Sequence, residues 1–151
     1  MLLALKSLRR PYTHVFSIDV SQACRDTMRF NYGDTFTLYQ DATRRNVGKM
    51  PKVDLYRAGF PCQPYSTQGV HGGLGDPRGG QVLASILAYV KRHRPNLVIL
   101  ENVKGLVTQR SEVLNSLAQV LSSYNYDVHW KVLNAKDFGV AGGPRIPKAY
   151  P

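Results

Sequence analysis

Short apolar runs alternate with longer amphipathic stretches along the chain, and this alternation sets the expected fold. The apolar runs have the length and composition of strands, and the stretches between them repeat apolar positions every three or four residues. The predicted strands are residues 14–18, 35–39, 53–58, 96–100 and 126–133, and the predicted helices are residues 2–10, 21–31, 80–94 and 111–123. Strands separated by helices predict right-handed crossovers and a mostly parallel α/β sheet flanked by helices.

Two of these elements have patterns that predict their burial. One face of the helix at 80–94 carries Val82, Ile86, Tyr89 and Val90, so this face is expected to pack on the sheet. The last predicted strand alternates apolar and polar residues, which is typical of an edge or half-exposed strand.

A cysteine and an acid follow two of the predicted strands. The run Gly59-Phe60-Pro61-Cys62-Gln63-Pro64 places Cys62 in a turn braced by prolines, and Glu101 comes at the end of the strand at 96–100. Parallel neighbouring strands would bring Cys62 and Glu101 to one rim of the sheet. Open α/β sheets bind their ligands at that rim.

Composition fits one globular domain over residues 1–151, with 43% hydrophobic and 20% charged residues. The formal net charge of +10 favours a polyanionic partner, although a ribosomal or membrane-surface protein can be equally basic. Short basic runs such as Arg44-Arg45 are each expected to lie on a solvated surface. The apolar run at the N-terminus is too short for a signal peptide or a membrane span.

The two cysteines, Cys24 and Cys62, are too few for a disulfide scaffold and indicate a reducing compartment. Cys24 falls in the helix at 21–31, where we expect a small buried apolar residue. No zinc-ligand spacing is present, so no metal site is predicted.

Several ordered motifs resemble one family, the cytosine-C5 DNA methyltransferases. Its members carry their nucleophile in Pro-Cys-Gln and their acid in Glu-Asn-Val, which match residues 61–63 and 101–103. Further matches, in family order and at family spacing, are Asp19, Asp41-Ala42, Asp76-Pro77-Arg78-Gly79 and the segment 132–140. The resemblance covers roughly residues 12–140. Ordered motifs of this kind are hard to match by chance.

The resemblance implies a partial Rossmann-like methyltransferase fold that uses S-adenosylmethionine, with DNA as the partner. It assigns catalysis to Cys62 and Glu101, and cofactor binding to Asp19, Asp41 and Pro61. The substrate-binding positions that it implies are Gln63, Ser66, Arg78 and Asn102. The polar loop at 66–79 corresponds to the family's catalytic loop. For His71 in this loop, a role in the site and a plain solvated position are equally compatible with the sequence. The implied location is the nucleus in a eukaryote and the cytoplasm in a bacterium or virus.

Two departures from the family pattern bear on activity. The family's glycine loop for the methionine part of the cofactor has no counterpart before Asp19, and Arg145 is out of register with the family's arginines by one residue. No segment resembles a target-recognition domain. We therefore expect a partial catalytic domain that binds S-adenosylmethionine weakly and does not methylate DNA alone.

Two other functions stay open. One is a catalytically inactive remnant that binds nucleic acid or a partner chain. The other is an RNA cytosine methyltransferase, although Gly59-Phe60-Pro61-Cys62 looks more like the DNA-acting members. The sequence does not indicate the methylated sequence context or the oligomeric state.

Overall fold

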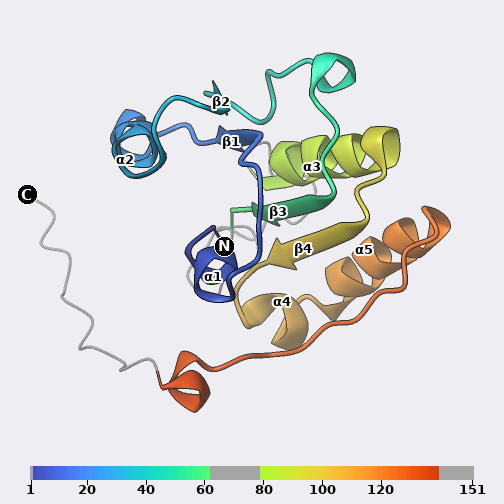
Figure 1. The fold of residues 1–151 in the computed structure, drawn as a ribbon. Coiled ribbons are helices and arrows are strands. Elements are labelled where there is room, and N and C mark those ends of the chain that lie inside the picture. The colour runs from blue at the N-terminus through green and yellow to red at the C-terminus, as the bar shows by residue number, and fades with distance from the viewer. Residues whose placement is uncertain (1, 62–78, 140–151) are drawn as a thin grey trace, which may run out of the picture.

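The computed structural model describes residues 2–61 and 79–139, which form an α/β fold of short parallel sheets flanked by helices (Figure 1). The elements are α1 (Leu2–Ser7), β1 (Phe16–Ile18), α2 (Gln22–Tyr32), β2 (Thr37–Tyr39), β3 (Leu55–Gly59), α3 (Gly79–His93), β4 (Leu97–Glu101), α4 (Gly105–Thr108) and α5 (Ser111–Ser123). Two 3₁₀ turns, Val47–Lys49 and Ala135–Phe138, complete the described elements. The expected fold class is thereby confirmed.

The strands form two parallel pairs. In the first pair β1 lies beside β2, with Phe16 opposite Thr37, and in the second β3 lies beside β4, with Gly59 opposite Glu101. A helix connects the strands of each pair, α2 in the first and α3 in the second, as the alternating pattern predicted.

Within the described residues no backbone ladder joins the two pairs, so the parallel sheet is divided into two parts. Aromatic side chains connect them instead. The ring of Phe16 on β1 lies 6.2 Å from that of Tyr56 on β3 and 5.5 Å from that of Tyr89 on α3, measured between centroids.

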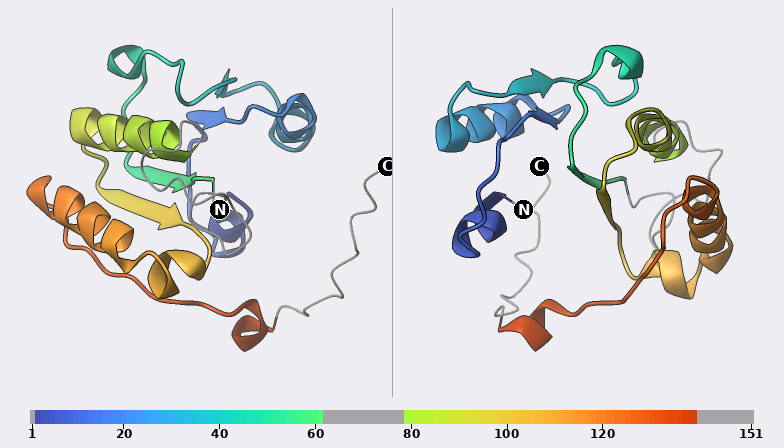
Figure 2. Two further views of the ribbon diagram at one scale, coloured as in Figure 1. Left: turned by 180° about the vertical axis from the view of Figure 1, so that it is seen from behind. Right: turned by 45° about the vertical axis from the view of Figure 1, so that its right-hand side comes forward.

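The core lies against the second pair. Figure 2 shows α3 and α5 on the same side of β3 and β4. The side chains of Tyr56 on β3 and Leu83 on α3 are both buried. The buried apolar residues are Met50, Tyr56, Phe60, Leu83, Ile86, Tyr89, Val90, Leu106, Val113, Leu117 and Leu121. The predicted apolar face of α3 is confirmed, with Val82 partly buried at its edge.

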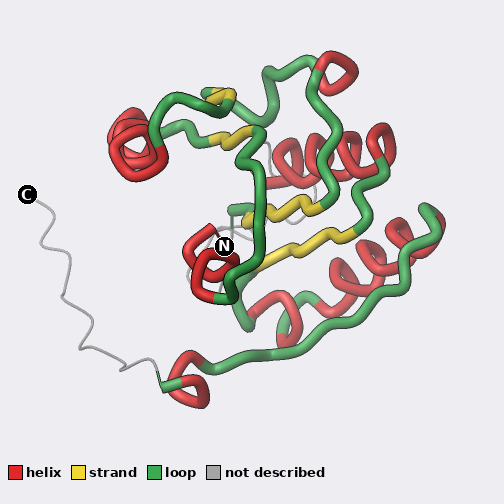
Figure 3. Tube along the Cα trace, in the orientation of Figure 1, coloured by secondary structure: helices red, strands yellow, loops and turns green. Residues whose placement is uncertain are grey.

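The segment at 126–133 does not form the predicted strand; Figure 3 draws it as a loop. Tyr126 and Val128 do pack on the core, and the Tyr126 hydroxyl donates to the carbonyl of Pro95 at 2.7 Å. Trp130 and Val132 are exposed. The alternation of apolar and polar residues thus leads to packing only at Tyr126 and Val128. A strand also needs a hydrogen-bonded neighbouring strand, and none lies beside this segment in the described part of the chain.

Cys24 was also predicted wrongly, because its side chain is exposed on α2. The only buried residue of α2 is Arg25, and Phe30 on the same helix is 90% exposed. Met28 and Tyr32 of this helix are half-buried, and the Tyr32 ring lies 5.9 Å from that of His14. No described helix is long and apolar enough to cross a membrane.

Candidate active site and cofactor site

The carboxyl ends of β3 and β4 form the first part of the site. Because Gly59 and Glu101 are opposite each other in the register, the Glu101 carboxylate lies over the glycine. A Cβ placed on Gly59 would lie 3.1 Å from Oε2 of Glu101, which is closer than ordinary van der Waals contact. The glycine therefore makes room for the acid at this rim.

A side chain from β4 also fixes the chain that leads to Cys62. The amide of Asn102 donates from Nδ2 to the carbonyl oxygen of Phe60 at 3.1 Å, and the Phe60 side chain is buried. Pro61 follows directly. The predicted neighbourhood of the two strands is thus confirmed up to Pro61, whereas Cys62, Gln63, Ser66 and Arg78 lie outside the described residues.

The contact made by Asn102 differs from the substrate contact that the resemblance implied. Its Nδ2 binds the backbone, and its Oδ1 accepts from the N–H of Val103 at 2.9 Å. In this structure the side chain of Asn102 holds the ends of β3 and β4 together, so its observed contacts position the backbone at this rim.

Asp19 and Asp41 lie at the carboxyl ends of the first strand pair. The backbone N–H of Asp19 continues the ladder by donating to the carbonyl of Tyr39 at 3.2 Å. One carboxylate oxygen of Asp19 accepts from the N–H of Ser21 at 2.8 Å, and Ser21 in turn caps α2. Asp41 follows β2 after a single intervening residue.

Asp41 is held in its ionised form by its neighbours. Its Oδ1 accepts from both the hydroxyl and the N–H of Thr43, each at 2.7 Å, and its Oδ2 lies 3.5 Å from Arg44. These hydrogen bonds, chiefly the one from the hydroxyl, lower the pKa of Asp41, and the Arg44 guanidinium adds to the effect. The carboxylate is therefore a hydrogen-bond acceptor at neutral pH.

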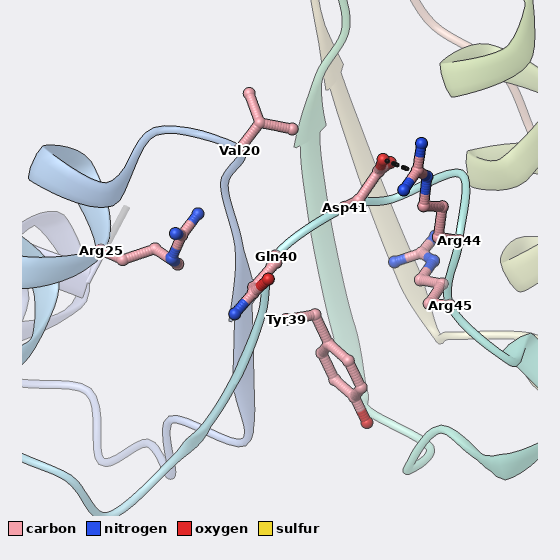
Figure 4. Close-up of a pocket in the computed structure, with 7 residues that line it drawn as sticks. All are labelled: Val20, Arg25, Tyr39, Gln40, Asp41, Arg44 and Arg45. Carbon is pink, nitrogen blue, oxygen red and sulfur yellow. Dashed lines mark ion pairs between the residues drawn. The ribbon is translucent and has the colours of Figure 1, made fainter.

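An open pocket of about 490 Å³ lies between these two strand ends (Figure 4). Figure 4 shows Arg25 entering from one side, with Asp41, Arg44 and Arg45 on the other. Its lining residues are Val20, Arg25, Tyr39, Gln40, Asp41, Arg44 and Arg45. The volume falls in the usual range for small-molecule sites.

The residues around this pocket fit the adenosyl part of S-adenosylmethionine. Carboxylates at the ends of adjacent parallel strands can accept hydrogen bonds from ribose hydroxyls, and Asp41 is ionised. Val20, which is 75% exposed, and the ring of Tyr39 offer apolar surface to a base. The arginines of the pocket are not explained by this ligand, which carries no phosphate.

Sequence reasoning missed two of these residues. Arg25 was not singled out, and Arg45 was expected on a solvated surface; Arg45 is instead partly buried, while Arg44 is 87% exposed as expected. Nothing in the sequence around Arg44 and Arg45 distinguishes the buried arginine from the exposed one. The described residues contain no group of three or more histidines, cysteines or acids that could hold a metal.

The parallel strand pairs, with acids at their carboxyl ends and a pocket beside the first pair, define an α/β protein whose strand ends are open to a ligand. Residues 1–142 match the family described as C-5 cytosine-specific DNA methylase. The chain belongs to this family.

Relatives support the assignment. The chain is 37% identical to the type II methyltransferase M.DsaV of Dactylococcopsis salina over 83% of this chain and 35% of the relative. It is 37% identical to M.NlaIV and 34% identical to M.NlaX, both of Neisseria lactamica, over 83% of this chain and 31% and 40% of those proteins. The chain thus spans about a third of the length of these relatives.

Proposed function

We propose that this chain carries the central catalytic part of a DNA cytosine-5 methyltransferase, which methylates C5 of a flipped cytosine through a covalent adduct with Cys62. The observation that carries the proposal is the pairing of β3 with β4. This pairing places Gly59, three residues before Cys62, opposite Glu101, and Asn102 binds the carbonyl of Phe60, in a chain of this family.

The chemistry requires a nucleophile and an acid on one cytosine ring. The Cys62 thiolate adds to C6, which breaks the conjugation of the ring and makes C5 electron-rich. Glu101 donates a proton or a strong hydrogen bond to N3, and this stabilises the charge that the addition creates. S-adenosylmethionine, when bound, supplies the methyl group that C5 takes up. The methylated C5 then gives its proton to water, the C6–S bond breaks, and N3 returns its proton to Glu101, which restores the aromatic ring and the free thiolate.

The observed geometry supports these roles on the acid side. Glu101 is exposed at the strand end, so its carboxylate can reach a base that approaches the rim. C5 and C6 are inaccessible in a stacked duplex, and the base must therefore leave the helix to reach this site. Asn102 and Gly59 fix the rim against which it would lie.

Trapping on a DNA duplex that contains 5-fluorocytosine tests the proposal, because fluorine at C5 cannot leave as the proton does. The chain is assayed alone and joined to the flanking segments of M.NlaX, with intact M.NlaX as the positive control. We expect a covalent complex in the joined protein that disappears in Cys62→Ser, and little trapping by the chain alone.

Three outcomes would contradict the proposal. A complex that persists in Cys62→Ser would exclude this nucleophile. A folded joined protein that traps no DNA, while M.NlaX does, would favour the inactive remnant. Trapping of a 5-fluorocytosine RNA in preference to the duplex would favour the RNA methyltransferase.

A further inference from the structure

The connector between β2 and β3 carries Asp41, but it has little regular structure of its own. Between Tyr39 and Leu55 the regular structure is the short 3₁₀ turn Val47–Lys49. The carboxylate of Asp41 is fixed within the connector by Thr43, whose N–H and hydroxyl both donate to its Oδ1. These local bonds shape the turn around Asp41, but they do not attach it to the rest of the fold.

Ser85 on α3 attaches this turn to the helix. Its hydroxyl donates to the carbonyl of Ala42, the residue that follows Asp41 directly. Its own carbonyl accepts from Nη2 of Arg45 at 3.2 Å. Ser85 thus contacts the connector on both sides of Thr43, with one side-chain bond and one backbone bond.

The hydroxyl of Ser85 departs from the usual pattern of a serine within a helix. Such hydroxyls commonly donate to a carbonyl one turn earlier in their own helix. Ser116 on α5 does so, with the carbonyl of Glu112 as acceptor at 2.8 Å, and Thr27 on α2 does so with that of Ala23. Because serine also favours a helix less than alanine does, the bond made by Ser85 serves the connector rather than α3.

We propose that Ser85 is a positioning residue, which holds the turn of Asp41 in the form that binds the adenosyl part of S-adenosylmethionine. This role rests on the function proposed above, since that function assigns the pocket to this ligand. Ser85 does not line the pocket and acts through the backbone of Ala42. The other side-chain bonds from α3 reach the connector at Val47 and Pro51, farther along the chain from Asp41. A turn that is ordered beforehand loses less freedom when a ligand binds, so the bond from Ser85 raises the affinity.

Ser85→Ala in the 151-residue chain, labelled with ¹³C and ¹⁵N, tests this role by NMR. S-adenosylhomocysteine is the probe, because it has the adenosyl part and no methyl group to transfer. We expect the variant to bind it about fivefold more weakly, which is the loss expected for one hydrogen bond between neutral groups. The bonds from Thr43 hold the pKa of the Asp41 carboxyl low, and this pKa should rise toward its ordinary value as the turn loosens.

Three comparisons separate positioning from a general effect on the fold. Ser85→Thr keeps the hydroxyl and should restore both the affinity and the low pKa. Ser116→Ala is the matched control, because it makes the same change where the hydroxyl bonds its own helix, and it should alter neither measurement. In the joined protein with the flanking segments of M.NlaX, Ser85→Ala should raise the KM for S-adenosylmethionine about fivefold and leave kcat unchanged.

The role of Ser85 is overturned if Ser85→Ala leaves either the affinity or the pKa of Asp41 unchanged. It is also overturned if Ser85→Thr behaves as Ser85→Ala does, or if Ser116→Ala has an equal effect. These outcomes concern the variants alone and leave the proposed function intact. If neither the wild-type chain nor the joined protein binds S-adenosylhomocysteine, the cofactor assignment of the proposed function fails, and the role of Ser85 fails with it.

Discussion

The smallest residue at the rim, Gly59, controls the position of the acid opposite it. The glycine has no side chain to meet Glu101, and the two residues face each other because the strands pair in this register. A methyl group at Gly59 would lie 3.1 Å from Oε2 of Glu101, so the carboxylate would have to move by a few tenths of an ångström. The position of the proposed acid therefore depends on a neighbour that takes no part in chemistry.

This dependence predicts a coupling between the two residues. Gly59→Ala should lower the free energy of unfolding by about 0.5–1 kcal/mol, because the exposed Glu101 carboxylate has to turn aside from the new methyl group. In a Glu101→Ala background the same change should cost nothing, because the crowded carboxylate is gone. Urea unfolding of the four proteins gives the interaction energy, which we expect to exceed about 0.5 kcal/mol. Equal effects of Gly59→Ala in both backgrounds would show that the two side groups do not compete for space.

At the scale of elements, α3 holds the connector between β2 and β3 through one row of side chains. The Ser85 hydroxyl donates to the carbonyl of Ala42, that of Tyr89 donates to the carbonyl of Pro51 at 2.7 Å, and His93 Nε2 binds the carbonyl of Val47 at 2.7 Å. These residues are four apart and so share one face of the helix. The row fixes the connector that carries Asp41 and Arg45.

Tyr89→Phe tests this row. Tyr89 is fully buried, and loss of its hydroxyl leaves the Pro51 carbonyl without this donor, so the variant should lose about 1 kcal/mol of stability at pH 7. Burial raises the pKa of Tyr89 to about 12 from 10.0. The neutral hydroxyl of Tyr89 therefore contributes its full stabilisation of the folded state below pH 10. This contribution is lost as the pH rises toward 12.

The difference between wild type and Tyr89→Phe should therefore shrink between pH 10 and 12, as measured by urea unfolding at each pH. Tyr12→Phe serves as the control, because Tyr12 is exposed and should change neither the stability nor its pH dependence. A difference that stays constant up to pH 12 would contradict the role given to the Tyr89 hydroxyl.

At the scale of the whole molecule, the two strand pairs are unequally supported. Every residue of the buried apolar core lies between Met50 and Leu121, so the core belongs to β3, β4 and the helices that follow them. Neither β1 nor β2 contains a fully buried residue, and the buried residue of α2 is the charged Arg25. Phe16, Ile18 and Tyr39 of the first pair pack against that core while remaining only partly buried.

This asymmetry predicts two levels of stability. Amides of β1 and β2 should exchange with solvent through openings of lower free energy than amides of β3 and β4, because local opening exposes little apolar surface there. Native-state hydrogen exchange followed by mass spectrometry measures both sets in one sample. Phe16→Ala should lower the protection of β1 and β2 further and leave β4 nearly unchanged. Equal opening free energies for all four strands would show instead that the molecule unfolds as one unit.

The sequence by itself determined most of the element types and the parallel direction of the strands. Runs of apolar residues of strand length, separated by amphipathic stretches, predict strands and helices because burial favours each periodicity only in its own backbone geometry. The same patterns placed Asp19, Asp41 and Glu101 at strand ends. The motif order around Pro61 and Glu101 was enough to indicate the family that the comparison then showed.

Only the tertiary structure decided which residues have partners. The alternation at 126–133 could not reveal whether a neighbouring strand lies beside it, and the pattern of α2 could not show that Cys24 is exposed while Arg25 is buried. Arg44 and Arg45 are adjacent and chemically identical, yet one faces solvent and the other has buried donors without acceptors. Burial and hydrogen bonding depend on what the rest of the chain brings to a residue, and local sequence does not contain that information.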